Sequence, residues 1–253
     1  MVFYNSVNFY NNVGANVPIS RIGFRSSVNF PATDGTKKDS FSTNPMYNDF
    51  GTKSEIEAIA KTNPRIKEIL KENKIPLQVN INELEKLKQG HLKNSRIIAA
   101  KMYSAMPEDM KKDVNLSDLQ EATMLHDYGK VLIPKEILNK NSTLDIEEKQ
   151  IMDLHSELGY ELLKEKGVRP NVLNLVKYHH QTPDGTGYPS VDNNFEYTTE
   201  MAMLAAADKY SALTENRSYK SAMPKDEALE IIQEDVDKGL IPQEVFDALK
   251  KSV

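Results

Sequence analysis

One stretch of the chain places a histidine and an aspartate side by side, His126 and Asp127, followed closely by Gly129 and Lys130. The pair offers an imidazole nitrogen and two carboxylate oxygens, and only the carboxylate can bridge two cations. Gly129 would let the backbone leave a helix tightly, and Lys130 sets a fixed positive charge just past that turn. These residue types are typical of a metal-dependent phosphate site, although a His-Asp pair alone is weak support because chance pairs are common.

The rest of the chain supplies further candidate ligands. All five histidines of the protein fall in predicted helices or at their ends: His91, His126, His155, His179 and His180. Taken singly, His91 or His155 is also explained as an interior histidine satisfied by a hydrogen bond. An isolated pair such as His179 and His180 is also explained as a solvated turn.

Asp208 lies in a strongly apolar segment that contains Met201, Met203, Leu204 and three alanines. A carboxylate in such a helix costs several kcal/mol unless it is paired or metal-bound. A salt bridge to a lysine or arginine is the alternative explanation. Four separate predicted helices thus bring histidines and a fifth brings Asp208. Five imidazoles and two carboxylates suit two first-row metal ions roughly 3.5–4 Å apart, with Asp127 best placed to bridge them, whereas calcium would want more oxygen.

Helical spacing of apolar residues and capping signals predict an all-α domain from about residue 52 to the end, with no convincing strand, repeat or Gly-rich phosphate loop. The signals place helix starts at the Thr52/Glu55 capping box, Pro64, about Asn82 (running through His91 to Met106), Ser117/Gln120, Pro134 (to Leu138), Asp145/Glu148 (to about Lys166), Pro170, Glu200 (to about Thr214), Lys225 and Pro242. The segment Asp184 to Pro189 is predicted to be a loop from its Gly and Pro content.

Composition limits the function. The 253 residues carry a net charge of −5 and no cysteine, which excludes disulfides and thiolate metal sites and fits a cytoplasmic protein. No apolar run or basic start indicates a membrane span or secretory signal, and no basic patch indicates a nucleic-acid partner. Residues 1–50 are predicted to be a disordered polar tail, or alternatively a docking segment whose scattered aromatic residues engage a protein partner. Residues 51–80 are expected to form a short helical lead-in.

At this point the motifs resemble those of the HD-GYP family, a branch of the HD-domain metal-dependent phosphohydrolases. Order, spacing and flanking residues agree in His91, His126-Asp127-Tyr-Gly129-Lys130, Ile133-Pro134, His155 followed by Gly159, His179-His180, Asp184-Gly-Thr-Gly187-Tyr188-Pro189, Ala207-Asp208-Lys209-Tyr210 and Arg217-Ser-Tyr219-Lys220. The resemblance implies that residues 81–253 form a helical bundle of about seven helices.

The resemblance also implies the site and its chemistry. The family's metal ligands correspond to His91, His126, Asp127, His155, His179, His180 and Asp208. It implies that Lys130 lies near the scissile phosphate and that Arg217 and Lys220 hold substrate phosphates. Family members typically hydrolyse cyclic di-GMP to linear pGpG or GMP with iron or manganese; zinc, nickel and cobalt remain alternatives. A bridging hydroxide between two metals would attack phosphorus, with Asp127, Lys130 and Asp208 as the catalytic residues.

The sequence departs from the family pattern at three positions. Gln181 replaces the usual glutamate after the two histidines, and a glutamine cannot act as a general base. Leu87 stands where some members carry a glutamate for a third metal, which favours two metals. Asn216 replaces the usual aspartate before the arginine.

Three alternatives stay open on sequence grounds. Tyr188 either stacks on a guanine at the substrate mouth or packs on the bundle. The substrate is either cyclic di-GMP or another cyclic dinucleotide or nucleotide. Finally, the chain is either an enzyme or a catalytically weak docking module. A protein partner would bind through the tail or through the segment Asp184 to Pro189, which we call the Gly-Tyr-Pro loop. The complete ligand set favours the enzyme.

Overall fold

The computed structural model describes residues 51–192, 195–216 and 221–253. Within these ranges the secondary structure is helical, apart from one isolated antiparallel bridge between His180 and Tyr188. The prediction of an all-α protein is therefore confirmed. None of the helices in the described ranges is long and apolar enough to cross a membrane.

The predicted bundle of about seven helices corresponds to the longer helices after residue 80. In the described residues, seven of these have nine residues or more: α4 (Lys93–Ala105), α6 (Leu116–Leu125), α9 (His155–Glu165), α10 (Pro170–Tyr178), α11 (Thr199–Thr214), α12 (Lys225–Asp237) and α13 (Gln243–Ser252). Shorter helices connect them: α3 (Ile81–Leu87), α5 (Glu108–Lys111), α7 (Lys135–Leu138) and α8 (Ile146–Asp153). A π-helical turn, Lys88–Leu92, joins α3 to α4 without a break.

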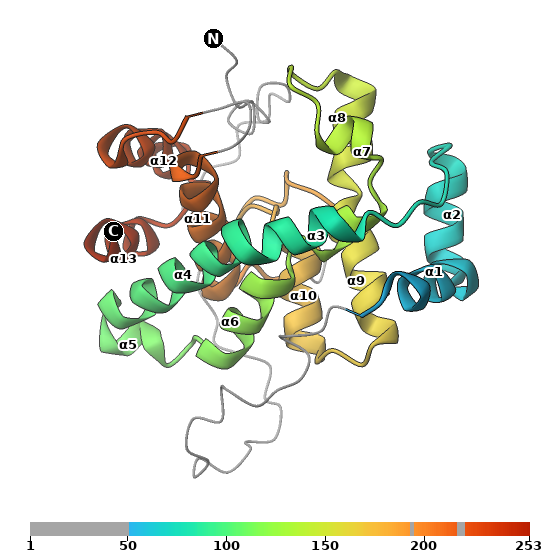
Figure 1. The fold of residues 1–253 in the computed structure, drawn as a ribbon. Helices are drawn as coiled ribbons and strands as arrows, with labels where there is room; N and C mark the ends of the chain where they lie inside the picture. Colours follow the sequence, from blue (N-terminus) through green and yellow to red (C-terminus); the bar gives the residue numbers. More distant parts are fainter. Residues whose placement is uncertain (1–50, 193–194, 217–220) are drawn as a thin grey trace.

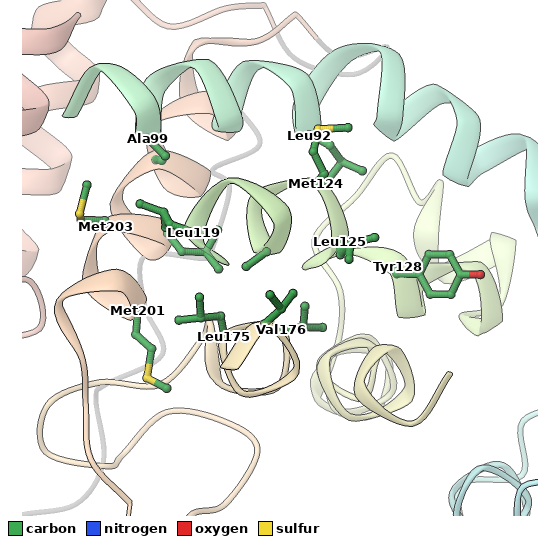
Figure 2. Close-up of a cluster of buried hydrophobic side chains, with 14 of the residues drawn as sticks. Leu92, Ala99, Leu119, Met124, Leu125, Tyr128, Leu175, Val176, Met201 and Met203 are labelled. Atoms are coloured by element: carbon green, nitrogen blue, oxygen red, sulfur yellow. The ribbon is translucent and has the colours of Figure 1, made fainter. Parts of the chain in front are cut away.

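The core lies where the longer helices of the bundle meet. Helix α4 packs against α6, α11 and α13, while α10 packs against α6 and α9. Figure 1 shows α12 and α13 at one end of the molecule and α9 toward the other. Figure 2 shows apolar side chains of α6 and α10 facing one another, among them Leu119, Leu175 and Val176. Burying each such side chain stabilises the fold by about 1.5–3 kcal/mol, so this core fixes the helix ends that carry the candidate ligands.

Two short helices precede the bundle, α1 (Lys53–Thr62) and α2 (Pro64–Glu72), and both pack on α9 at one end of the molecule (Figure 1). The capping box predicted for Thr52 and Glu55 is present. Asn63 caps α2 and donates a hydrogen bond to Glu161 of α9, and Arg65 pairs with Glu157 at 2.8 Å. These contacts place the lead-in beside α9.

Two predicted helix boundaries are wrong. Helix α6 is capped by Asn115, whose side chain accepts from the Asp118 N–H, and Ser117 lies inside the helix. The helix expected from Asp145 to about Lys166 is interrupted at Leu154, between α8 and α9. At this interruption the His155 ring places Nδ1 2.7 Å from the Met152 carbonyl oxygen.

The role expected for Gly129 is also corrected. Gly129 is not among the glycines with a positive φ, so a left-handed exit from the helix is not its purpose. A Cβ at this position would lie 1.9 Å from the His155 carbonyl oxygen and 2.4 Å from the Gly159 nitrogen. Gly129 therefore lets the 3₁₀ turn Tyr128–Leu132 press directly against the backbone of α9.

Some predictions concern residues outside the described ranges. These are the disordered tail or docking segment at residues 1–50 and the phosphate-binding roles of Arg217 and Lys220.

Candidate metal centre

The predicted ligands come from five places in the fold, and the structure brings them together. His91 lies in the π-helical turn before α4, and His126 and Asp127 end α6. The remaining ligands are His155 at the start of α9, His179 and His180 after α10, and Asp208 within α11. Their ligand atoms form three overlapping groups, each with all its atoms within 4.8 Å: His91–His126–Asp208, His155–His179–His180 and His126–Asp127–His179.

The first group, which we call the α11 half, consists of His91, His126 and Asp208. The Oδ1 atom of Asp208 lies 2.7 Å from His91 Nε2 and 3.5 Å from His126 Nε2. Its side chain is 18% exposed, so Asp208 is less buried than the apolar segment predicts. Its partners are these histidines, while the neighbouring Lys209 pairs with Asp235. This geometry favours the ligand interpretation of Asp208 over a salt bridge.

The second group, which we call the α10 half, consists of His155, His179 and His180. The Nε2 atoms of His155 and His179 are 3.2 Å apart, and the His155 and His180 ring centroids are 5.1 Å apart. Two ring nitrogens this close suit ligation of one ion. The half contains no carboxylate of its own.

Asp127 lies between the two halves and faces both. Its Oδ1 is 3.5 Å from His155 Nε2, in the α10 half. Its Oδ2 is 3.7 Å from His126 Nε2 and 3.9 Å from His91 Nε2, in the α11 half. One oxygen turned toward each group is the arrangement that a bridging carboxylate requires.

Backbone carbonyl groups fix the orientation of three histidine rings, on the side away from the centre. The Nδ1 atoms of His126, His155 and His179 lie 3.0, 2.7 and 2.7 Å from the carbonyl oxygen of the residue three positions earlier in each case. Each Nδ1 therefore donates to a carbonyl and leaves Nε2 directed at the centre. A metal-binding histidine usually makes such a hydrogen bond with the ring nitrogen that does not bind the metal.

The protonation states of the α10 half suit a metal. Burial, with a smaller contribution from neighbouring positive charge, lowers the pKa of His155 to about 4 and that of His180 to about 3, and lowers the pKa of His179 as well. All three rings are therefore neutral at pH 7, so their lone pairs are free without loss of a proton.

The α11 half carries charge. Burial opposes the charged form of His91, but the hydrogen bond that His91 donates to Asp208 and the nearby Glu215 outweigh it and raise the pKa of His91 to about 9. Burial also opposes ionisation of Asp127 and Asp208, yet Lys130 beside the first and His126 and His91 beside the second hold both pKa values well below the usual range. Both carboxylates are ionised at neutral pH.

One unsatisfied atom shows that the donor set fits a metal. The Nε2 atom of His126 is buried and has no hydrogen-bond partner among the described residues. Leaving a buried polar atom unpaired costs about 1–3 kcal/mol. A cation between His91, His126 and Asp208 would satisfy it, and imidazole and carboxylate ligands are those of first-row divalent metals.

Lys130 contacts this centre directly. Its Nζ lies 2.6 Å from Asp127 Oδ2, and its side chain is 20% exposed. The lysine therefore places a positive charge at the rim of the centre, where the sequence predicts the scissile phosphate. Its role toward substrate stays a prediction.

The Gly-Tyr-Pro loop folds back onto His180. The Tyr188 ring stacks on the His180 ring with centroids 4.6 Å apart, and Lys149 of α8 lies 5.5 Å from the centroid of the tyrosine ring. A Cβ on Gly187 would lie 2.1 Å from the His180 carbonyl oxygen. Tyr188 is thus packed on the bundle, as one of its two predicted alternatives states, and stacking on a base stays a prediction.

Gln181 holds the same loop. Its side chain is buried, and its Nε2 donates to the Pro189 carbonyl oxygen at 2.5 Å. The residue that departs from the family pattern therefore acts here as a hydrogen-bond donor to the loop, which an ionised glutamate could not do.

Two polar residues beside His91 are missed by the sequence reasoning. Ser211 Oγ lies 3.1 Å from His91 Nδ1, and Glu215 Oε2 lies 3.6 Å from the same atom. A signal was present, because Asp208, Ser211 and Glu215 are spaced by three and four residues and so share one face of α11 and its end.

Comparison with known proteins shows the family to which this chain belongs. An HD-domain family model matches residues 78–244, so the chain belongs to the HD-domain family. The resemblance identified from the motifs is confirmed.

The chain is also similar to curated relatives and to a solved structure. The chain is 34% identical over 135 residues to 3'3'-cGAMP-specific phosphodiesterase 3 of Vibrio cholerae, covering 53% of this chain and 29% of that protein. It is 33% identical over 141 residues to a cyclic di-GMP phosphodiesterase of Thermotoga maritima, covering 55% and 38% respectively. The match thus spans less than two fifths of either relative. The HD domain of L. monocytogenes phosphodiesterase PgpH is 20% identical, with a TM-score of 0.47 over 66% of this chain and 93% of that one.

Proposed function

We propose that this chain is a metal-dependent phosphodiesterase that hydrolyses a cyclic dinucleotide, with cyclic di-GMP as substrate and linear pGpG or GMP as product. The observation that carries the proposal is the position of Asp127, with one oxygen toward each of two groups of ligand atoms. The names of the curated relatives support the substrate class, since they include phosphodiesterases for cyclic di-GMP and for 3'3'-cGAMP.

The proposed ligands are three side chains per ion and a shared carboxylate. His91, His126 and Asp208 would hold one ion, and His155, His179 and His180 the other, with Asp127 between them. Iron and manganese are the proposed metals, with zinc, nickel and cobalt as alternatives, because the donors are imidazole nitrogens and carboxylate oxygens. When bound, the two ions supply Lewis acidity and an activated water.

The chain's own residues perform the remaining tasks. Lys130, 2.6 Å from Asp127 Oδ2, would orient the substrate phosphate and stabilise negative charge that develops on its oxygens. Asp208 would orient the attacking water while it binds metal. Tyr188, stacked on His180, would form one wall of the substrate mouth. Arg217 and Lys220 are proposed to hold phosphates from outside the described ranges.

The experiment measures metal content and turnover together. The purified chain is loaded separately with iron, manganese, zinc or nickel, and its hydrolysis of cyclic di-GMP is compared with that of 3'3'-cGAMP and of simple nucleotides. We expect about two ions per chain and faster turnover of cyclic di-GMP. Faster turnover of 3'3'-cGAMP would keep the reaction and change the substrate. Two bound ions without any hydrolysis would overturn the enzyme proposal in favour of a docking module.

A further inference from the structure

One histidine of the centre is held differently from three others. His126, His155 and His179 stand at helix ends or at the break between α8 and α9, where carbonyl groups are free to accept from Nδ1. His91 instead lies inside the continuous helical segment that runs from α3 through the π-helical turn into α4. Because the carbonyls of a continuous helix are occupied by its own ladder, the Nδ1 of His91 needs a partner from another element.

Ser211 of α11 provides the first contact with His91. Its hydroxyl donates to the His91 carbonyl oxygen at 3.3 Å. A hydroxyl has one proton, so toward the His91 ring Ser211 Oγ acts as an acceptor, at 3.1 Å from Nδ1. In this arrangement Nδ1 carries a hydrogen that Ser211 accepts, and Nε2 is the nitrogen that faces Asp208 and His126.

Glu215 lies behind the same atom. Its Oε2 is 3.6 Å from His91 Nδ1, and its side chain is 21% exposed, close to that of Asp208. The distance is too long for a good hydrogen bond, but a negative charge this close favours a hydrogen on Nδ1.

The backbone of the His91 turn makes room for this carboxylate. A Cβ on Gly90 would lie 2.6 Å from Glu215 Oε1. Any larger residue at position 90 would therefore displace the carboxylate from His91. The glycine is in the π-helical turn, a distortion that is frequent at functional sites. Glycine at 90 and glutamate at 215 thus form one matched arrangement.

We infer that Glu215, seated against Gly90 and acting together with Ser211, is a positioning residue that fixes the His91 ring with Nε2 toward the α11 half of the metal centre. The inference rests on the proposed metal centre and adds to it a set of contacts from α11. It assigns to Ser211 and Glu215 together the role that backbone carbonyls perform for His126, His155 and His179.

The first test is a titration of the metal-free chain with manganese(II), followed as two binding steps. We expect Glu215→Ala to weaken one step by about 10–100-fold, the range typical of lost contacts behind a metal-binding histidine. The weakened step should be the one that His91→Ala abolishes, and the step that His180→Ala abolishes should stay unchanged. Glu215→Gln, which keeps an acceptor but loses the charge, should fall between wild type and Glu215→Ala. Glu244→Ala, an exposed glutamate of α13, is the matched control.

The second test uses Gly90→Ala, which leaves Glu215 in the chain but displaces its carboxylate. Alanine favours helix over glycine, so the melting temperature of the metal-free protein should be unchanged or higher. The affinity of the same manganese step should nevertheless fall. Because the added methyl group has nothing left to displace once Glu215 is truncated, the double variant Gly90→Ala/Glu215→Ala should bind manganese as Glu215→Ala does.

The outcomes separate this inference from the proposed function. Wild-type protein that binds no manganese contradicts the metal centre itself. If wild-type protein binds two ions and Glu215→Ala leaves both steps unchanged, the role of Glu215 is overturned and the metal centre stands. Equal weakening of both steps would show a general structural effect and would also overturn it. Additive losses in the double variant would overturn the matched arrangement with Gly90.

Discussion

The two halves of the metal centre differ in their side chains and in their charge. The α10 half consists of three histidines whose pKa values are lowered by burial, and it has no carboxylate of its own. The α11 half contains Asp208 and the charged surroundings of His91. Asp127 is shared by both halves.

The difference shows how a helical bundle orients ligands. A histidine at a helix end can donate a hydrogen bond to a free backbone carbonyl three residues earlier in the chain. The local sequence therefore sets the orientation of its ring. A histidine inside a continuous helix depends on a partner from elsewhere, here Ser211 and Glu215. Substitutions that disturb His126, His155 or His179 should therefore act through backbone geometry, and those behind His91 through side-chain contacts.

Removing the shared carboxylate should have the largest effect. In Asp127→Ala both groups lose a ligand and Lys130 loses its partner, so we expect loss of both ions and of measurable hydrolysis. Metal content by elemental analysis and phosphodiesterase turnover should fall together. Asp247→Ala, on the exposed face of α13, should change neither. A variant of Asp127 that retained two ions and full turnover would falsify the bridging role.

Removing one histidine from either half should have a selective effect. We expect His180→Ala to bind one ion, held in the α11 half, and His91→Ala to bind one ion, held in the α10 half. Each loss should lower turnover by several orders of magnitude, since a metal ion stabilises the charge of the transition state by several kcal/mol. Elemental analysis checks the stoichiometry. Loss of both ions from both variants would mean that the halves are one cooperative site.

Removing the positive charge at the rim should affect chemistry and spare metal binding. Lys130→Met keeps the length of the side chain, so we expect about two ions per chain and a turnover lowered by about 10²–10³-fold, as for loss of one donor to a developing oxyanion. Lys135→Met, at an exposed position of α7, is the control. Unchanged turnover in Lys130→Met would show that the 2.6 Å contact with Asp127 is its whole role.

The sequence was sufficient for what depends on residue type and local spacing. The His-Asp pair, the apolar helix faces and the capping boxes at Thr52 and Asp145 are local signals, and the structure contains the corresponding helices and the cluster of ligands. The cap of α6 was misplaced because Asn115 and Ser117 are both good capping residues two positions apart, and their local sequence does not choose between them.

What the sequence left unpredicted depends on contacts between distant segments. The reason for Gly129 is the proximity of α9, whose backbone a Cβ at that position would meet. The contact of His91 with Ser211 joins residues 120 positions apart. A residue spacing on α11 indicates that Asp208, Ser211 and Glu215 share a face, but only the packed structure shows that the face meets His91.

The smallest expected effect sharpens the comparison on the α10 side. Gln181→Leu keeps a similar volume but removes the donor to the Pro189 carbonyl oxygen, so the Gly-Tyr-Pro loop should be held on His180 less firmly, by ring stacking and by the Tyr188 N–H bond to the His180 carbonyl oxygen. We expect a loss of about 1–3 kcal/mol in the free energy of unfolding, the cost of an unpaired buried group, measured by urea denaturation.

The same variant should distinguish the two halves. Because the loop packs on His180 and the nearby contacts of His91 come from α11, the manganese step of the α10 half should weaken and that of the α11 half should not. Gln150→Leu, exposed on α8, controls for the added apolar surface. If Gln181→Leu weakened the α11 step instead, the loop would be coupled to His91, and the independence of the two halves of the centre would fail.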